Sequence, residues 1–234
     1  MSLSTWTPTV VSSESFDWRG QAWRMVESQY IAATMKLVDS VHEQDMLEAL
    51  IEQSKPALPD DTAGLDYLLA TPFRYYPKRG GSRFRDIGDP GVFYAAQSVR
   101  TASAELGYWR WKFLQDAVDL ERLDPVAHTA FQVEVHAQVV DLRLSPFVRD
   151  SVYWQDPNDY EGTQSFARVA RQAGVGGILY RSVRDVKPSW CLALLTPSGF
   201  AKRKPNLGRQ TWYLTVSRHQ VVCRCEAGES FEFD

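Results

Sequence analysis

The chain has 234 residues, of which 44% are hydrophobic and 24% are charged, and its formal net charge is −3. This length supports one large domain, or one domain with an appendage, with a buried core. The 8 Trp, 10 Tyr and 11 Phe residues exclude a disordered chain. The charge balance excludes a dedicated nucleic-acid-binding protein, and no apolar run approaches the roughly 20 residues of a membrane span.

The cysteines and the N-terminus indicate a cytoplasmic protein. Met1 to Val10 lacks a basic stretch followed by an apolar one, so no secretory signal is predicted. Cys191, Cys223 and Cys225 lack the spacing of a four-ligand zinc site. We therefore expect three free thiols in a reducing compartment and no metal centre.

The first 64 residues predict a helical hairpin that forms an appendage to the body of the protein. This segment is acidic, with 4 Lys and Arg against 10 Asp and Glu. Apolar residues recur at steps of three and four, which is typical of an amphipathic helix. They are Trp23, Val26, Tyr30, Ala33, Leu37 and Val41, and then Met46, Leu47, Leu50 and Ile51. Pro56 and Pro59 end the pattern, and we expect the hairpin to pack on the body and to contribute to a dimer contact.

From residue 65 onward the pattern predicts an α+β fold with largely antiparallel sheets, so we divide the chain into segments 1–64 and 65–234. Many short β-like runs alternate with few helices in this part of the chain. Strands are expected at 91–95, 131–142, 177–180, 190–195 and 212–225, and helices at 98–117 and 164–173.

The Gly-rich run at 174–177 does not predict a dinucleotide fingerprint. It follows a predicted helix and precedes a predicted strand, which is the reverse of the order that phosphate binding at a helix N-terminus requires. We interpret Gly174 as the residue that ends the preceding helix.

A cluster of arginines, aromatic residues and one carboxylate carries the candidate chemistry. Five short motifs follow one another in order. They are Arg74-Tyr75, a Gly-Ser-Arg-Phe turn at Arg83, a Val-x-Tyr strand at Tyr94, an Ala-x-x-Glu helix at Glu105, and a Tyr-x-Ser-x-Arg strand around Ser182. Over residues 65–200 this order resembles the RES domain, the toxin half of bacterial Xre–RES toxin–antitoxin pairs.

The resemblance implies an ADP-ribosyltransferase-like fold of mixed and antiparallel sheets with flanking helices. It implies an enzyme that consumes NAD⁺ as a substrate, without a cofactor, as a glycohydrolase or phosphorylase. It also implies a homodimer and a cognate Xre-type helix-turn-helix antitoxin as partner. Two alternatives stay open, a mono-ADP-ribosyltransferase with a protein target and a non-catalytic nucleotide-binding module.

The residue types suit this chemistry. Cleavage of the nicotinamide–ribose bond passes through an oxocarbenium-like state, which a carboxylate such as Glu105 stabilises. Guanidinium groups match phosphate oxygens, and tyrosine rings stack on planar bases. The expected catalytic residues are Glu105, Arg74 and Ser182, with Ser182 bonding the substrate or orienting Glu105, and the expected NAD⁺-binding residues are Arg83, Tyr94 and Tyr75. Arg85 departs from the family pattern and leaves the acceptor open.

Overall fold

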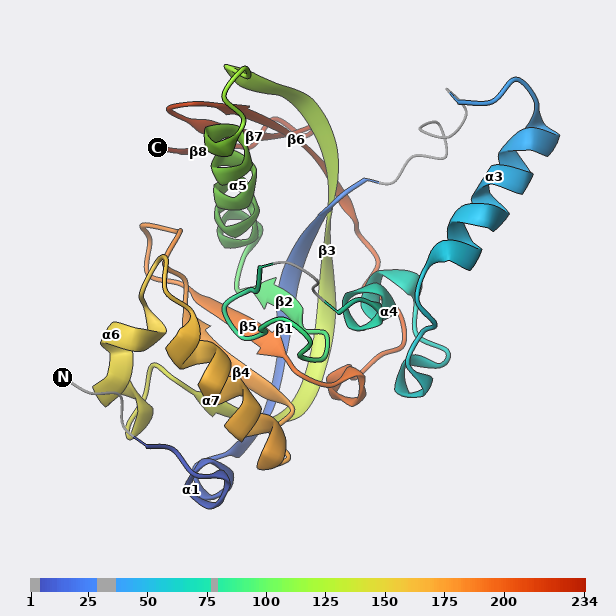
Figure 1. Ribbon diagram of the computed structural model, residues 1–234. Coiled ribbons are helices and arrows are strands. Elements are labelled where there is room, and N and C mark those ends of the chain that lie inside the picture. Colours follow the sequence, from blue (N-terminus) through green and yellow to red (C-terminus); the bar gives the residue numbers. More distant parts are fainter. Residues whose placement is uncertain (1–4, 29–36, 77–79) are drawn as a thin grey trace.

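The computed structural model describes residues 5–28, 37–76 and 80–234 and has a mixed α+β fold built on an eight-stranded sheet (Figure 1). The strand order is β1-β2-β5-β4-β3-β6-β7-β8. The strands are β1 (Phe16–Glu27), β2 (Phe93–Ala96), β3 (Arg122–Asp141), β4 (Gly177–Arg181), β5 (Trp190–Leu194), β6 (Gln210–Ser217), β7 (Val221–Cys225) and β8 (Ser230–Phe233). The α+β prediction is confirmed.

The long strands β1 and β3 organise the sheet. They pair antiparallel from Phe16↔Val139 to Glu27↔His128, and β1 also pairs with β2 at Trp23↔Ala96. The pairings β1–β2–β5–β4–β3–β1 therefore form a closed circuit, from which β6, β7 and β8 extend. All pairs are antiparallel except β3 with β4.

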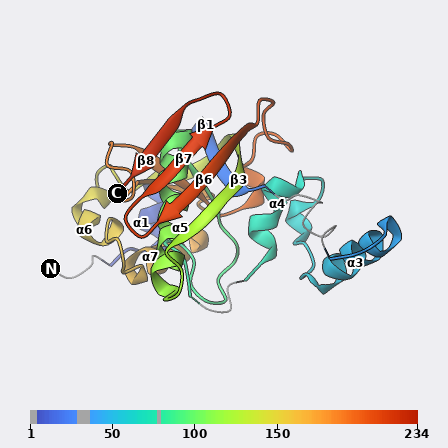
Figure 2. The same ribbon diagram turned by 90° about the horizontal axis from the view of Figure 1, so that it is seen from above.

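Apart from α3, the helices lie around the sheet, as Figure 2 shows from above. Their buried side chains contribute to two hydrophobic clusters. The helices are α1 (Pro8–Ser13), α3 (Val41–Ser54), α4 (Tyr67–Arg74), α5 (Val99–Asp116), α6 (Ser151–Trp154) and α7 (Glu161–Gln172), with short 3₁₀ turns at Asp60–Thr62, Phe147–Asp150 and Pro197–Gly199. The larger cluster contains residues of α5, α6 and α7, and the smaller one contains residues of α4.

Helix α5 lies against the sheet and carries the Ala-x-x-Glu motif. The Ser98 hydroxyl caps its first turn by accepting a hydrogen bond from the Thr101 N–H at 3.1 Å. Gly107 allows a close approach to β7, because a Cβ at this position would lie 2.8 Å from Val221 Cγ1. The cap and the close packing fix the helix that presents Glu105.

The prediction of a helix over residues 23–41 is wrong, because Trp23 and Val26 lie in strand β1. Trp23 packs on the larger cluster, whereas Ala22 and Val26 belong to the smaller one. A strand that buries apolar side chains on both faces shows no polar–apolar alternation, so its spacing resembled that of a helix. Tyr30 and Ala33 lie outside the described residues.

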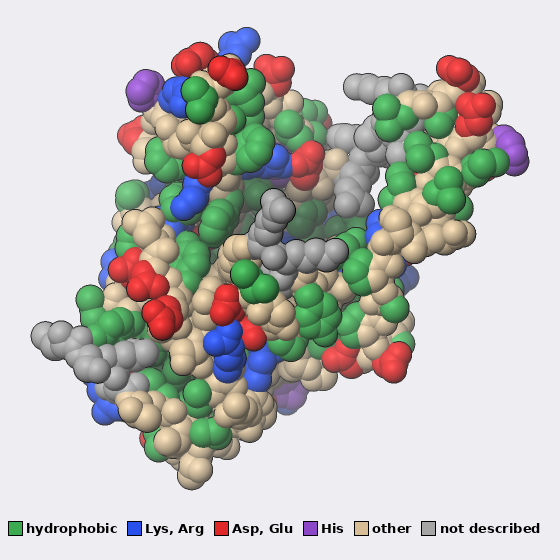
Figure 3. Space-filling model, in the orientation of Figure 1, with side chains coloured by type: hydrophobic (Ala, Val, Ile, Leu, Met, Phe, Trp, Pro, Cys, Tyr) green, Lys and Arg blue, Asp and Glu red, His purple; other side chains and the backbone are tan. Residues whose placement is uncertain are grey.

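The second helix predicted in this segment is confirmed as α3, which stands away from the body of the molecule (Figure 1). Its side chains Val41, Met46 and Leu50 are exposed, and Figure 3 shows apolar and acidic side chains side by side on this outlying part. The segment before residue 65 is thus not an appendage as a whole, because β1 is part of the central sheet.

The predicted elements after residue 90 are confirmed, with one subdivision. The run predicted as a strand at 212–225 is two strands, β6 and β7, joined by a turn. Gly174 follows α7 with a φ of 73°, as expected of a residue that ends a helix. The three cysteines are free, and no helix in the described ranges is long and apolar enough to cross a membrane.

Candidate active site

A pocket of about 230 Å³ lies between α5, strands β1 and β2, the end of β4 and the start of β5. We call it the central pocket. Its lining combines one carboxylate, three arginines and several aromatic rings. The lining residues are Trp23, Arg24, Met25, Ser82, Arg83, Tyr94, Ala95, Ala96, Ala102, Glu105, Leu106, Trp109, Tyr160, Tyr180, Arg184 and Cys191.

Glu105 and Ser182 meet at the edge of the central pocket, as their assignment to one site predicts. The Ser182 hydroxyl donates a hydrogen bond of 2.6 Å to Glu105 Oε1. The Ser182 Oγ atom in turn accepts hydrogen bonds from the backbone N–H groups of Arg184 at 3.3 Å and Asp185 at 3.1 Å. This hydrogen bond and the two backbone donors fix both side chains, so Ser182 is suited to orient the Glu105 carboxylate.

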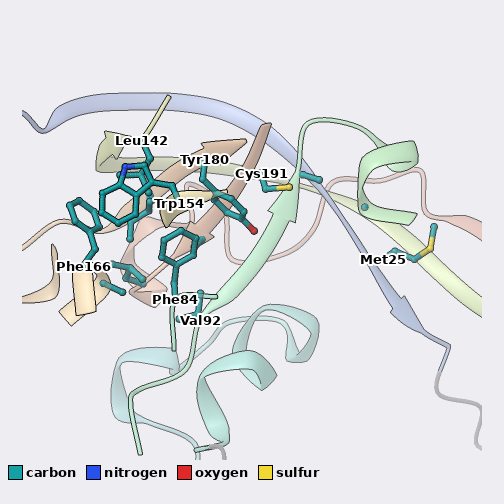
Figure 4. Close-up of a cluster of buried hydrophobic side chains, with 14 of the residues drawn as sticks. Met25, Phe84, Val92, Leu142, Trp154, Phe166, Tyr180 and Cys191 are labelled. Carbon is teal, nitrogen blue, oxygen red and sulfur yellow. The ribbon is translucent and has the colours of Figure 1, made fainter. Parts of the chain in front are cut away.

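The floor of the pocket holds two further polar groups that stay protonated near neutral pH. The Cys191 thiol lies 3.7 Å from Glu105 Oε1, to which it donates. Burial raises the pKa of the Cys191 thiol and the pKa of the Tyr180 phenol well above their usual ranges. Figure 4 shows Cys191 beside Tyr180, whose ring packs edge-on against Phe84. These two groups line the same pocket as the Glu105 carboxylate and add no charge to it.

Tyr94 holds the Gly-Ser-Arg-Phe turn in place. Its hydroxyl lies 2.8 Å from Ser82 Oγ and accepts a hydrogen bond of 3.0 Å from the Phe84 N–H. Burial raises the pKa of the Tyr94 phenol. The phenol therefore holds the residues on both sides of Arg83 and fixes the position of that arginine in the turn.

Arg83 reaches the pocket as predicted, but its contacts also serve the fold. Its Nη1 donates to the backbone carbonyls of Trp154 and Asp156, both at 2.9 Å. Its guanidinium lies 4.8 Å from the centre of the Tyr160 ring. These contacts orient the cation, and no ion pair neutralises it among residues 5–28, 37–76 and 80–234.

Arg184, which also lines the central pocket, is held in the same way. Its guanidinium lies 3.3 Å from the centre of the Tyr108 ring. It donates to the Tyr160 hydroxyl at 3.2 Å and to the carbonyl of Pro157. Tyr160 thus joins the two arginines, because its ring faces one and its hydroxyl the other.

Arg24 on β1 is a pocket residue that the sequence reasoning missed. Its Nη1 donates to the carbonyl of Tyr94 at 2.7 Å, its guanidinium lies 4.7 Å from the Phe93 ring centre, and its Nε is buried without a partner. Burial lowers its pKa to about 10. The sequence signal for Arg24 was a cation between two apolar residues, Trp23 and Met25. That segment was predicted to be a helix, so the signal was not recognised.

Arg74 and Tyr75 lie outside the central pocket. Arg74 ends α4, where its Nη1 pairs with Glu52 at 2.7 Å and its Nε donates to the carbonyl of Pro56. Tyr75 is 39% exposed, and its carbonyl accepts from Arg85 at 3.3 Å. Arg74 thus ties α3 and its linker to the body, and its charge is neutralised by a carboxylate.

The electrostatics of the central pocket favour an anionic ligand. Arg24, Arg83 and Arg184 face carbonyls and aromatic rings, and Glu105 is the single carboxylate of the lining. Guanidinium groups without an acidic partner are suited to phosphate oxygens. No cluster of three or more potential metal ligands occurs in the part of the chain that the structure describes.

The RES domain family model matches residues 58–217. The chain belongs to the RES domain family. The match includes Arg83, Tyr94, Glu105 and Ser182, whereas Arg24 lies before it. Membership therefore rests on the segment that carries the Glu105–Ser182 pair.

One solved structure to which this RES-domain protein is similar is the crystal structure of the M. tuberculosis MbcT–MbcA toxin–antitoxin complex. The two chains are 12% identical, the match covers 90% of each, and the TM-score is 0.48. No curated protein sequence matches the chain.

Proposed function

We propose that this RES-domain protein cleaves the nicotinamide–ribose bond of NAD⁺, by hydrolysis or by phosphorolysis. The observation that supports this most is the Glu105 carboxylate, held by the Ser182 hydroxyl at 2.6 Å beside three arginines without acidic partners. A dinucleotide with two phosphates and one cationic ring matches that distribution of charge.

Glu105 supplies the charge that the reaction needs. As the nicotinamide–ribose bond breaks, positive charge develops on the ribose, and a carboxylate beside it stabilises that state. Nicotinamide leaves as a neutral molecule, so no general acid is required. The Ser182 hydroxyl and the Cys191 thiol donate to Glu105 Oε1 and hold the carboxylate in one orientation.

The arginines are proposed to bind the diphosphate. Arg83 and Arg184 are held by carbonyls and by Tyr160, so little side-chain entropy is lost when a phosphate binds. Arg24 adds a third cation at the junction of β1 and β2. The proposed site therefore contains Glu105 and Ser182 for the chemistry and the arginines for binding.

In the cell this activity fits a toxin, because depletion of NAD⁺ stops growth. The family resemblance supports a toxin–antitoxin system in the cytoplasm, with an Xre-type antitoxin as partner and a homodimer as the assembly. The proposed enzyme has NAD⁺ as its substrate and needs no separate cofactor.

The test is incubation of the purified protein with NAD⁺, with and without phosphate, followed by mass spectrometry. Hydrolysis gives ADP-ribose, phosphorolysis gives a phosphorylated ADP-ribose, and a mono-ADP-ribosyltransferase leaves ADP-ribose on a protein. We expect Glu105→Gln to lower turnover about 10²- to 10³-fold with the fold retained. Glu134→Gln is the matched control, since Glu134 pairs with Lys202 outside the pocket. Wild-type protein that binds NAD⁺ without turnover would indicate a non-catalytic module instead.

A further inference from the structure

Asp185 is a buried carboxylate next to the candidate site that no step above uses. Its side chain is 1% exposed and accepts three hydrogen bonds. The donors are Thr101 Oγ1 at 2.9 Å, Arg100 Nε at 3.2 Å and the Lys187 N–H at 3.1 Å. The same residue donates its own backbone N–H to Ser182 Oγ at 3.1 Å.

These bonds connect the two elements that carry the catalytic pair. Thr101 lies on α5 one helical turn before Glu105, so both side chains project from the same face of the helix. Ser182 and Lys187 lie in the loop between β4 and β5. Asp185 therefore links the loop that holds Ser182 to the helix that holds Glu105.

The surroundings of Asp185 supply hydrogen-bond donors and a counter-charge to its carboxylate. Arg100 Nε and the Lys187 N–H donate to Oδ1 and the Thr101 hydroxyl donates to Oδ2, so both carboxylate oxygens accept hydrogen bonds. Arg100 supplies the counter-charge and itself lies 4.9 Å from the Phe233 ring centre, so the ion pair is largely removed from water. A charge buried in this way is held in one place, since moving it would leave an unpaired ion.

We propose that Asp185 is a positioning residue that sets the Ser182–Glu105 distance by fixing the β4–β5 loop to α5. The proposal rests on the NAD⁺-cleaving function proposed above. Asp185 touches no substrate and acts through Ser182. Its loss should lower kcat more than it raises KM for NAD⁺, because Arg24 and Arg83 lie on other elements and only Arg184 lies in the loop that Asp185 fixes.

A double-mutant cycle separates positioning from plain stability. We expect Asp185→Ala to lower kcat about 10- to 100-fold, since small displacements of a catalytic group have effects of this size. In a Ser182→Ala background the same substitution should cause no further loss, because the group through which it acts is gone. Losses that multiply in the double variant, or a change mainly in KM, would overturn the proposal.

The matched control is Asp141→Asn. Asp141 is equally buried and accepts two hydrogen bonds from the Arg143 side chain and one from its backbone, but it lies at the end of β3 outside the pocket lining. It should destabilise the protein without changing kcat per folded molecule. Asp185→Asn, which keeps one acceptor oxygen, replaces the alanine variant if the latter does not fold.

Amide hydrogen exchange provides a readout that does not depend on NAD⁺. The N–H groups of Arg184 and Asp185 donate to Ser182 Oγ, so their exchange reports the position of the loop. We expect Asp185→Ala to accelerate exchange at both amides at least tenfold, with no such change in Asp141→Asn. If wild-type protein lacked NAD⁺ turnover but the amides behaved in this way, the proposed function would fail while the anchoring of the loop stood. Unchanged amide exchange would overturn the positioning role whatever the activity.

Discussion

Burial of the charged Arg24 side chain lowers the free energy of unfolding, so its replacement by Met should raise the stability of the protein. Burial lowers the pKa of Arg24 to about 10, well below the ordinary range of a guanidinium. Because the folded state holds the proton less tightly than the unfolded state, the penalty is fully present below pH 10 and disappears only above the ordinary pKa of a guanidinium. At 1.36 kcal/mol per pKa unit, it amounts to about 3 kcal/mol.

The Arg24→Met variant also loses the hydrogen bond to the Tyr94 carbonyl, which contributes about 1 kcal/mol. We therefore expect the free energy of unfolding at pH 7 to rise by about 1 to 2 kcal/mol, measured by urea denaturation. Binding should change in the opposite direction. Loss of a charge-assisted bond to phosphate costs about 1.5 to 3 kcal/mol, which predicts roughly 10- to 100-fold weaker binding of ADP-ribose by calorimetry.

Arg171→Met is the matched control for this substitution. Burial lowers the pKa of Arg171 as well, but its guanidinium donates to the carbonyls of Leu195, Pro90 and Gly91 and lies outside the pocket lining. It should lose stability and keep its affinity for ADP-ribose. An Arg24→Met protein that loses stability and binds ADP-ribose like the wild type would refute the reasoning.

Three further predictions concern the walls of the pocket. Arg83→Lys should bind ADP-ribose at least tenfold more weakly and melt at a lower temperature, because a lysine cannot donate to two carbonyls while stacking on Tyr160. Equal affinity of the two proteins by calorimetry would show that Arg83 does not bind the phosphate. Trp109→Ala should lower kcat/KM for NAD⁺ about tenfold more than kcat/KM for nicotinamide mononucleotide, which has no adenine base. Trp109 lines the pocket, is 44% exposed and can stack on that base. Equal losses for the two substrates would contradict base stacking. At pH 8.5 iodoacetamide should modify the half-buried Cys225 well before Cys191, because burial raises the pKa of the Cys191 thiol and keeps it protonated; equal rates by peptide mass mapping would count against this.

Sequence patterns predicted the fold best where one face of an element is polar. Helix α7 is an example, since its apolar stripe and the following Gly174 define both the helix and its end. Strand β1 failed for the opposite reason, because its neighbouring residues bury on opposite faces of the sheet. Its pairing with β3, more than 100 residues away in the chain, decided the structure. Removal of residues 1–60 would therefore take away a central strand as well as α3.

The candidate site was predictable where short motifs carry their own geometry. The position of Glu105 could be predicted because it lies on a helix with a capped start, and that of Arg83 because it lies in a tight turn. The position of Ser182 could be predicted because it comes directly after strand β4. The sequence could not show that Arg24 and Tyr160 reach the same pocket, because they come from segments more than 100 residues apart.

The arginines near the site differ mainly in what surrounds their charge, and this difference explains the misassignment of Arg74. Arg74 pairs with Glu52, and Arg168 pairs with Asp86 and Asp89, so both are neutralised within the fold. Arg24 and Arg83 donate to carbonyls and lie over aromatic rings, which orient a guanidinium without cancelling its charge. An arginine that is paired with a carboxylate stabilises the fold, and its charge attracts a ligand only weakly. An arginine that is oriented but has no carboxylate partner can bind an anion. Sequence spacing does not report this property, because the carboxylate that decides it can lie anywhere in the chain.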